Sequence, residues 1–191
     1  MNWFRTAFDP ATASDLELAE RLRSGDEACW HELYRRHQGR LYRYALRMSG
    51  STATADEITQ ETFVTFLEQS GRYDAAQSPL AAWLLGIARN RLRKAYASTE
   101  PWDPIDDSPI PAPEHDPLAA LTHAERLASV RAAVQALPPA FREVVLLIEF
   151  EELSYEATAV VIGVPMGTVR SRLHRARGLL MQALAAQRVV Q

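Results

Sequence analysis

The feature that most limits how this chain can fold is a proline-rich acidic stretch near its middle. Residues 97–122 hold six of the eleven prolines and six acidic side chains, with no lysine or arginine. Proline breaks a helix interior, and such a stretch has too little apolar surface to offset the entropy of ordering. The sequence therefore predicts two folded units, residues 14–97 and 117–191. Between them lies a linker at residues 98–116, and a flexible tail at residues 1–13 precedes both.

Both units carry apolar residues at helical spacing and almost no signal for strands. Four helices are expected in the N-terminal unit, each beginning at a side chain that can cap it: Ser14, Asp26, Thr54 and Ser78. In the C-terminal unit, helices are expected to open at Asp116–Pro117 and at Pro138–Pro139. The expected fold class is all-α, with two small helical domains joined by the acidic linker.

The segment at residues 153–176 predicts two short helices around a tight turn. Ser154 can cap the first helix, and Gly163 can take the positive φ that ends it. An apolar stripe with spacings of four, three and four then marks the buried side of the second helix: Val169, Leu173, Ala176 and Leu180. This is the pattern of a helix-turn-helix, whose second helix enters the major groove of DNA. Thr158 is expected to bond its hydroxyl back to the carbonyl four residues earlier.

Basic side chains follow the open side of this second helix. The arginines are Arg170, Arg172, Arg175 and Arg177, and no acidic residue occurs from Gly167 to the C-terminus. Such a surface is suited to binding the phosphate groups of a nucleic acid. The alternative is a terminal amphipathic helix with a solvated basic face, but the turn and the apolar register both favour DNA binding.

Two further faces in the N-terminal unit could hold a partner. Acidic and amide side chains gather on the third helix, on the side away from Phe63 and Leu67: Asp56, Glu57, Gln60 and Glu61. This patch is either a partner site or a solvated helix start that complements the helix dipole. On the fourth helix, a basic cluster at residues 89–94 follows Trp83. Tyr73, in a polar loop with little to pack against, is the better candidate for stacking on a base.

Composition excludes several other classes of protein. The single cysteine allows neither an internal disulfide nor a cysteine zinc site, and the five histidines are scattered. We therefore predict no catalytic residue, no cofactor and no metal site. The net charge of −3 argues against a uniformly basic coat. No secretory signal and no apolar run near eighteen residues occur, which predicts a cytoplasmic protein without membrane insertion.

Three stretches together resemble one family. They are DEITQETF (residues 56–63), WLLGIARNRLRK (residues 83–94), and LPPAFREVVLL (residues 137–147) continuing through GTVRSRLHRAR (residues 167–177). In this order, around an acidic linker, they are similar to a bacterial RNA polymerase sigma factor of the minimal two-domain, extracytoplasmic-function type. The resemblance spans about residues 14–186.

The resemblance implies roles for particular residues. The polymerase-binding residues would be Asp56, Glu57, Gln60 and Glu61. Those at the melted downstream promoter element would be Tyr73, Arg89, Asn90, Arg93 and Lys94. Those at the double-stranded upstream element would be Thr168, Arg170, Ser171, His174 and Arg175. The implied partners are core RNA polymerase, promoter DNA and an anti-sigma factor. A stand-alone helix-turn-helix regulator is the main alternative; an enzyme or a purely structural adaptor fits the sequence less well.

Overall fold

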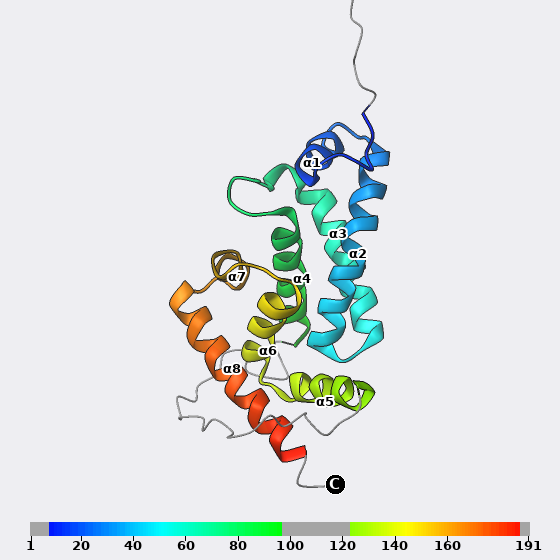
Figure 1. Cartoon of the computed structure of the whole chain (residues 1–191). Helices are drawn as coiled ribbons and strands as arrows, with labels where there is room; N and C mark the ends of the chain where they lie inside the picture. The colour runs from blue at the N-terminus through cyan, green and yellow to red at the C-terminus, as the bar shows by residue number, and fades with distance from the viewer. Residues whose placement is uncertain (1–7, 97–122, 188–191) are drawn as a thin grey trace, which may run out of the picture.

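The computed structural model describes residues 8–96 and 123–187, which are called here the N-terminal unit and the C-terminal unit. The predicted linker and the opening Asp116–Pro117 lie outside the described residues. Within the described ranges every regular element is a helix, as the sequence predicts (Figure 1). Among these helices none is both long enough and apolar enough to pass through a membrane.

The N-terminal unit is built around a pair of long antiparallel helices. Its helices are α1 (Asp15–Leu22), α2 (Glu27–Ser49), α3 (Thr52–Gln69), the short 3-10 turn η1 (Ser70–Arg72) and α4 (Leu80–Tyr96). Gly50 ends α2 with a φ of 71°, which glycine adopts without the strain that a Cβ would cause. The chain therefore reverses at once, so that α3 packs along α2, and α4 packs against both.

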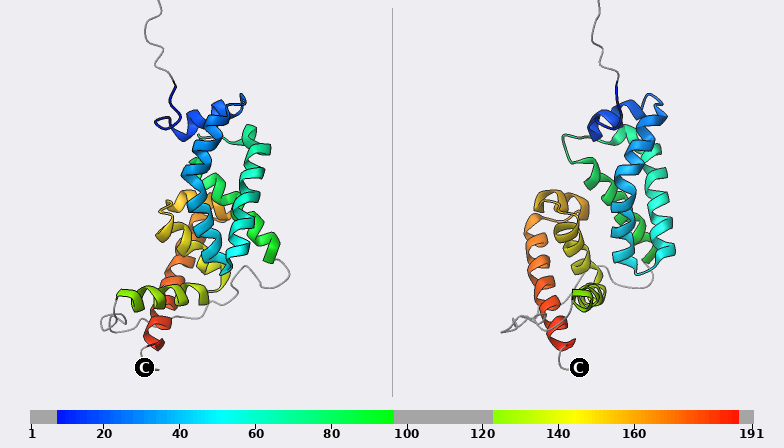
Figure 2. Two further views of the ribbon diagram at one scale, coloured as in Figure 1. Left: turned by 90° about the vertical axis from the view of Figure 1, so that its right-hand side faces the viewer. Right: turned by 45° about the vertical axis from the view of Figure 1, so that its right-hand side comes forward.

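The C-terminal unit follows the long helix α8. Its elements are α5 (His123–Ala136), α6 (Pro139–Val145), one stretch of π-helix η2 (Leu146–Phe150), α7 (Tyr155–Ile162) and α8 (Met166–Gln187). Helices α5, α6 and α7 all pack on α8 (Figure 2). α5 lies crosswise beyond the end of α2, as Figure 1 shows.

The predicted helix starts at Ser14 and Asp26 are confirmed and the one at Thr54 is wrong, while α4 begins at Leu80, two positions after the predicted cap Ser78. Ser14 forms its capping box with Glu17, and Asp26 caps α2. The prediction that Thr54 opens the third helix is wrong, because Ser51 caps it and its side chain accepts from the Thr54 N–H at 3.2 Å. Directly after the reversal at Gly50, Ser51 is the first side chain that can satisfy these N–H groups.

Residues 8–13, which the sequence assigns to a tail, lie against α2. The guanidinium of Arg36 donates to the carbonyls of Pro10 (3.1 Å), Ala11 (3.0 Å) and Ala13 (2.8 Å). The ring of Phe8 lies 3.5 Å from the guanidinium carbon of Arg21. One half-buried arginine, Arg36, thus holds this segment at the start of the N-terminal unit.

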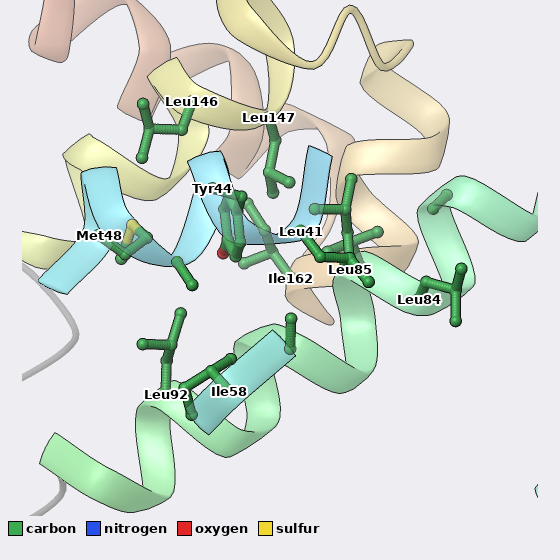
Figure 3. Close-up of a cluster of buried hydrophobic side chains, with 14 of the residues drawn as sticks. Leu41, Tyr44, Met48, Ile58, Leu84, Leu85, Leu92, Leu146, Leu147 and Ile162 are labelled. Atoms are coloured by element: carbon green, nitrogen blue, oxygen red, sulfur yellow. The ribbon is translucent and has the colours of Figure 1, made fainter. Parts of the chain in front are cut away.

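The two units share one hydrophobic core. Figure 3 shows Leu147 and Ile162 of the C-terminal unit beside Leu41, Tyr44 and Leu85 of the N-terminal unit, all of them buried. α4 contacts α7, and the end of α2 contacts α5 and α6. This docking decides which of the predicted site residues face the solvent.

Candidate nucleic-acid and partner interfaces

The helix-turn-helix forms as its local sequence predicts. The Ser154 hydroxyl accepts from the Ala157 N–H at 3.1 Å, and Gly163 ends α7 with a φ of 74°. The predicted stripe faces inward over its first three members, since Val169 is 0%, Leu173 2% and Ala176 0% exposed, and its last member, Leu180, is half-buried. The opposite side of α8 is therefore left toward the solvent.

The open face of α8 carries the residues predicted to reach the upstream element. Arg170, Ser171 and His174 are exposed, while Thr168 and Arg175 are half-buried beside them. The guanidinium of Arg170 lies 5.8 Å from the centre of the Tyr155 ring at the start of α7. This arrangement presents a cationic, hydrogen-bonding strip along the first turns of a helix, the part that enters a major groove.

Arg177 forms an ion pair within the C-terminal unit. Its Nη2 donates to Oε1 of Glu149 at 2.5 Å, and this hydrogen bond raises the pKa of Arg177. Because Glu149 lies in η2, the pair ties α8 to the segment before α7. The sequence placed Arg177 among the phosphate-facing arginines, but here it is paired with an acidic residue.

The acidic patch on α3 divides between two grooves. Asp56 and Gln60 line a groove between α2 and α3, together with Tyr34. Glu57 and Glu61 line a groove between α3 and α4. Asp56, Glu57 and Gln60 are exposed, and Glu61 is half-buried. The patch is therefore a ridge between two grooves, and a partner could contact it from both sides.

Glu61 differs from the rest of the patch because it has a partner within the unit. Its Oε2 lies 3.3 Å from Nη1 of Arg91 on α4. Replacing it would disturb the contact between α3 and α4 as well as the outer surface.

Apolar side chains continue the exposed face of α3 beyond the patch. The sequence places Leu67 with Phe63 on the inner side of this helix, opposite the patch, but Leu67 is 44% exposed, and Val64 is 54% exposed. The rings of Phe63 and Phe66 take the inner positions, where they contact Tyr34 and Trp83 respectively. Leu67, in the last turn, is left outside. Val64 was missed by the sequence analysis, although it follows Gln60 at the spacing of one helical turn.

The residues predicted for the downstream element do not share one environment. Asn90, Arg93 and Lys94 are exposed on α4. Arg89 is only 5% exposed, and its Nε donates to Oε1 of Glu143 at 2.5 Å. Glu143 is itself fully buried. The docked C-terminal unit therefore separates Arg89 from its neighbours in the predicted set.

Tyr73 packs inside the N-terminal unit. It is 6% exposed, and its ring centre lies 5.6 Å from that of Trp83. Its carbonyl accepts from Nη2 of Arg23 at 2.7 Å, which draws the loop toward α1, and burial raises the pKa of its hydroxyl. The expectation that Tyr73 has little to pack against is wrong. Its contact with a flipped base remains a prediction.

The hydroxyl of Thr158 does not make the bond predicted for it. Thr158 is fully buried in α7, and its Oγ1 has no hydrogen-bond partner. The carbonyl of Ser154 instead accepts from the Thr158 backbone N–H at 2.9 Å. A polar atom is thus buried without compensation.

Comparison with known proteins finds a matching family for each of the two units. Residues 33–100 match the Sigma-70 region 2 family, and residues 127–180 match the Sigma-70 region 4 family. The chain is 38% identical over 171 residues to the ECF RNA polymerase sigma factor SigE of Mycolicibacterium smegmatis, covering 85% of this chain and 65% of SigE. It is 34% identical to the ECF sigma factor SigM of Mycobacterium tuberculosis, covering 90% of this chain and 85% of SigM.

Solved structures agree with these relatives. CnrH in complex with the cytosolic domain of CnrY superposes with a TM-score of 0.68 at 26% identity, covering 90% of this chain and 97% of CnrH. The sigma factor RpoE in complex with the anti-sigma factor NepR, from Bartonella quintana, gives 0.60 at 25% identity, covering 81% and 96%. The chain belongs to the extracytoplasmic function (ECF) family of RNA polymerase sigma factors.

Proposed function

We propose that this chain binds core RNA polymerase, recognises promoter DNA and helps to melt it, so that transcription of a specific set of genes begins. The observation that carries the proposal is the pair of exposed faces on one chain: the acidic ridge of α3 in a region 2 unit and the cationic strip of α8 in a region 4 unit. The protein would act in the cytoplasm, by binding rather than by catalysis.

Core polymerase is proposed to bind the ridge formed by Asp56, Glu57, Gln60 and Glu61. Charged and amide side chains that line two adjacent grooves support this assignment, because a partner can contact them from both sides. Complementary charge would speed association as well as select the partner. The exposed Val64 and Leu67 extend the ridge with apolar surface.

Promoter DNA is proposed to bind at two places. The upstream element would meet Thr168, Arg170, Ser171, His174 and Arg175 on α8. The melted downstream element would meet Tyr73, Arg89, Asn90, Arg93 and Lys94 on and before α4. Residues 14–97 and 117–191 would then be the two functional domains, and the linker at residues 98–116 would span between them.

An anti-sigma factor is proposed as a third partner. One structural relative supports it, because the sigma factor RpoE of Bartonella quintana was solved in complex with the anti-sigma factor NepR. Another relative, CnrH, was solved in complex with the cytosolic domain of CnrY.

The proposal is tested by binding of the purified chain to bacterial core RNA polymerase. Glu57→Lys should weaken this binding strongly, because it reverses a charge on the exposed ridge without touching the Glu61–Arg91 pair. Glu20→Lys is the matched control, since Glu20 is exposed on α1 at the other end of the unit (Figure 1). Tight binding of the chain and of the control upholds the proposal. Failure of the folded chain to bind polymerase, with tight binding to duplex DNA alone, would favour a stand-alone regulator.

A further inference from the structure

A buried ion pair joins the two units at the helix that carries the predicted downstream residues. Nε of Arg89 on α4 donates to Oε1 of Glu143 on α6 at 2.5 Å, and Nη2 lies 3.5 Å from Oε2. Both residues are buried, at 5% and 0% exposure. A charged pair out of water is held strongly only while both partners are present, because either one alone would be an uncompensated buried charge.

A second carboxylate of the C-terminal unit is also buried against the N-terminal unit. Glu151 is 3% exposed, and its carboxylate lies 3.1 Å from Nε of Arg40 and 3.7 Å from Nη1 of Arg47, both on α2. The next residue, Glu152, has a φ of 54°, which is unusual for a side chain with a Cβ. The backbone is thus turned sharply where Glu151 enters the interface.

The last backbone carbonyls of α2 also accept hydrogen bonds from the other unit. The last carbonyls of a helix lack partners within it. Here the carbonyl of Arg47 accepts from Nε2 of Gln135 at 2.6 Å, and that of Met48 accepts from Nη1 of Arg142 at 2.6 Å. A cation at this position also complements the negative end of the helix dipole.

We propose that Glu143 competes with nucleic acid for the guanidinium of Arg89. Arg89 can then bind promoter DNA only when the two units are undocked. An arginine fork binds carboxylate and phosphate in the same planar manner, and it cannot satisfy both from a fully buried position. In the free chain the docked C-terminal unit therefore covers Arg89, which belongs to the predicted downstream DNA surface. Asn90, Arg93 and Lys94 remain exposed. The inference rests on the proposed function only for the identity of the competing ligand.

The docking itself is tested by the size of the full-length chain in solution. Small-angle scattering should give a larger radius of gyration for Glu143→Gln and for Arg89→Gln than for the unmodified chain, with the helical circular dichroism preserved. Glu149→Gln is the matched control, because Glu149 pairs with Arg177 inside the C-terminal unit and at the surface. An unchanged radius in both folded variants would overturn the inference.

The competition is tested by binding of a fluorescent single-stranded DNA of mixed sequence at low salt. Glu143→Gln should bind roughly tenfold more tightly than the unmodified chain, because a larger fraction of molecules is open. Arg89→Gln should open equally but gain no affinity, since it lacks the arginine. Equal affinity of Glu143→Gln, Arg89→Gln and the unmodified chain would overturn the competition.

These outcomes are separable from those of the polymerase test. If the unmodified chain binds polymerase and Glu143→Gln opens without binding DNA more tightly, the proposed function stands and the competition is wrong. If the unmodified chain fails to bind polymerase while Glu143→Gln still opens and still gains DNA affinity, the proposed function is wrong and the competition for Arg89 stands.

Discussion

Glu32 and Arg36, one turn apart on α2, are joined by an ion pair of 2.6 Å between Oε1 and Nε. Arg35 donates to the same carboxylate through two nitrogens, at 2.7 and 2.8 Å. The hydrogen bonds from Arg35 and Arg36 lower the pKa of Glu32 to about 2. Nearby, the hydrogen bond from His37 lowers the pKa of Asp15. The carboxylates that hold the first part of the chain are therefore stabilised in their charged form.

We expect the folded state to lose stability in acid through this cluster. A carboxyl group whose pKa is lower in the folded state contributes stability above its unfolded pKa, and that stability is lost as the pH falls toward the folded pKa. For Glu32 the window runs from the ordinary value of 4.5 down to about 2. Urea denaturation at several pH values in this window should show a smaller loss for Glu32→Gln than for the unmodified chain. Glu27→Gln, on the same helix and exposed, is the control; a Glu32→Gln curve parallel to the unmodified one would contradict the assignment.

Thr158→Val should raise the free energy of unfolding by about 1 kcal/mol, because it removes a buried hydroxyl without a partner and keeps the shape of the side chain. Thr62→Val is the matched control. Thr62 is also fully buried, but its Oγ1 donates to the Ile58 carbonyl at 2.7 Å, so the same substitution should bring no gain. Denaturant titration measures both. Equal effects of the two substitutions would show that the missing hydrogen bond is not the cause.

Tyr73→Ala should lower the free energy of unfolding by about 3 kcal/mol, because it leaves a cavity beside Trp83. Tyr73→Phe should stay within about 1 kcal/mol of the unmodified chain, since the ring and its packing are kept. Chemical denaturation followed by tryptophan fluorescence is a suitable measurement. A loss of less than about 0.5 kcal/mol for Tyr73→Ala would be the size expected of an exposed loop residue, and would contradict the buried position.

Arg170→Ala should weaken binding of the polymerase complex to its promoter by about 1–3 kcal/mol if the side chain reads a base. Binding to polymerase alone should not change, because α3 and α8 lie on different units. Arg177→Ala is the control, since Arg177 is paired with Glu149 and should leave promoter affinity unchanged. Filter or fluorescence binding at fixed salt measures both. Equal weakening of polymerase and promoter binding by Arg170→Ala would contradict the division of roles between the units.

The candidate interfaces were predictable where they depend on one helix. The exposed Asp56, Glu57 and Gln60 follow from the period of α3, and Arg170 and His174 follow from the buried stripe of α8. The exposure of Leu67 was not predictable, because it depends on the two phenylalanine rings that fill the inner positions before it. The position of the Tyr73 loop was not predictable either, because its backbone is hydrogen-bonded by Arg23, fifty positions earlier in the chain.

The sequence by itself determined the helices and the helix-turn-helix. Caps such as Ser154 and the glycine turn at Gly163 act within a few residues, so their effect can be read from neighbours in the chain. Only the tertiary structure decided that Arg89 is withdrawn from the surface. Its partner Glu143 is 54 positions away, on the far side of the predicted linker. A contact of that kind depends on how two amphipathic units dock, which the local pattern of hydrophobic and charged residues does not specify.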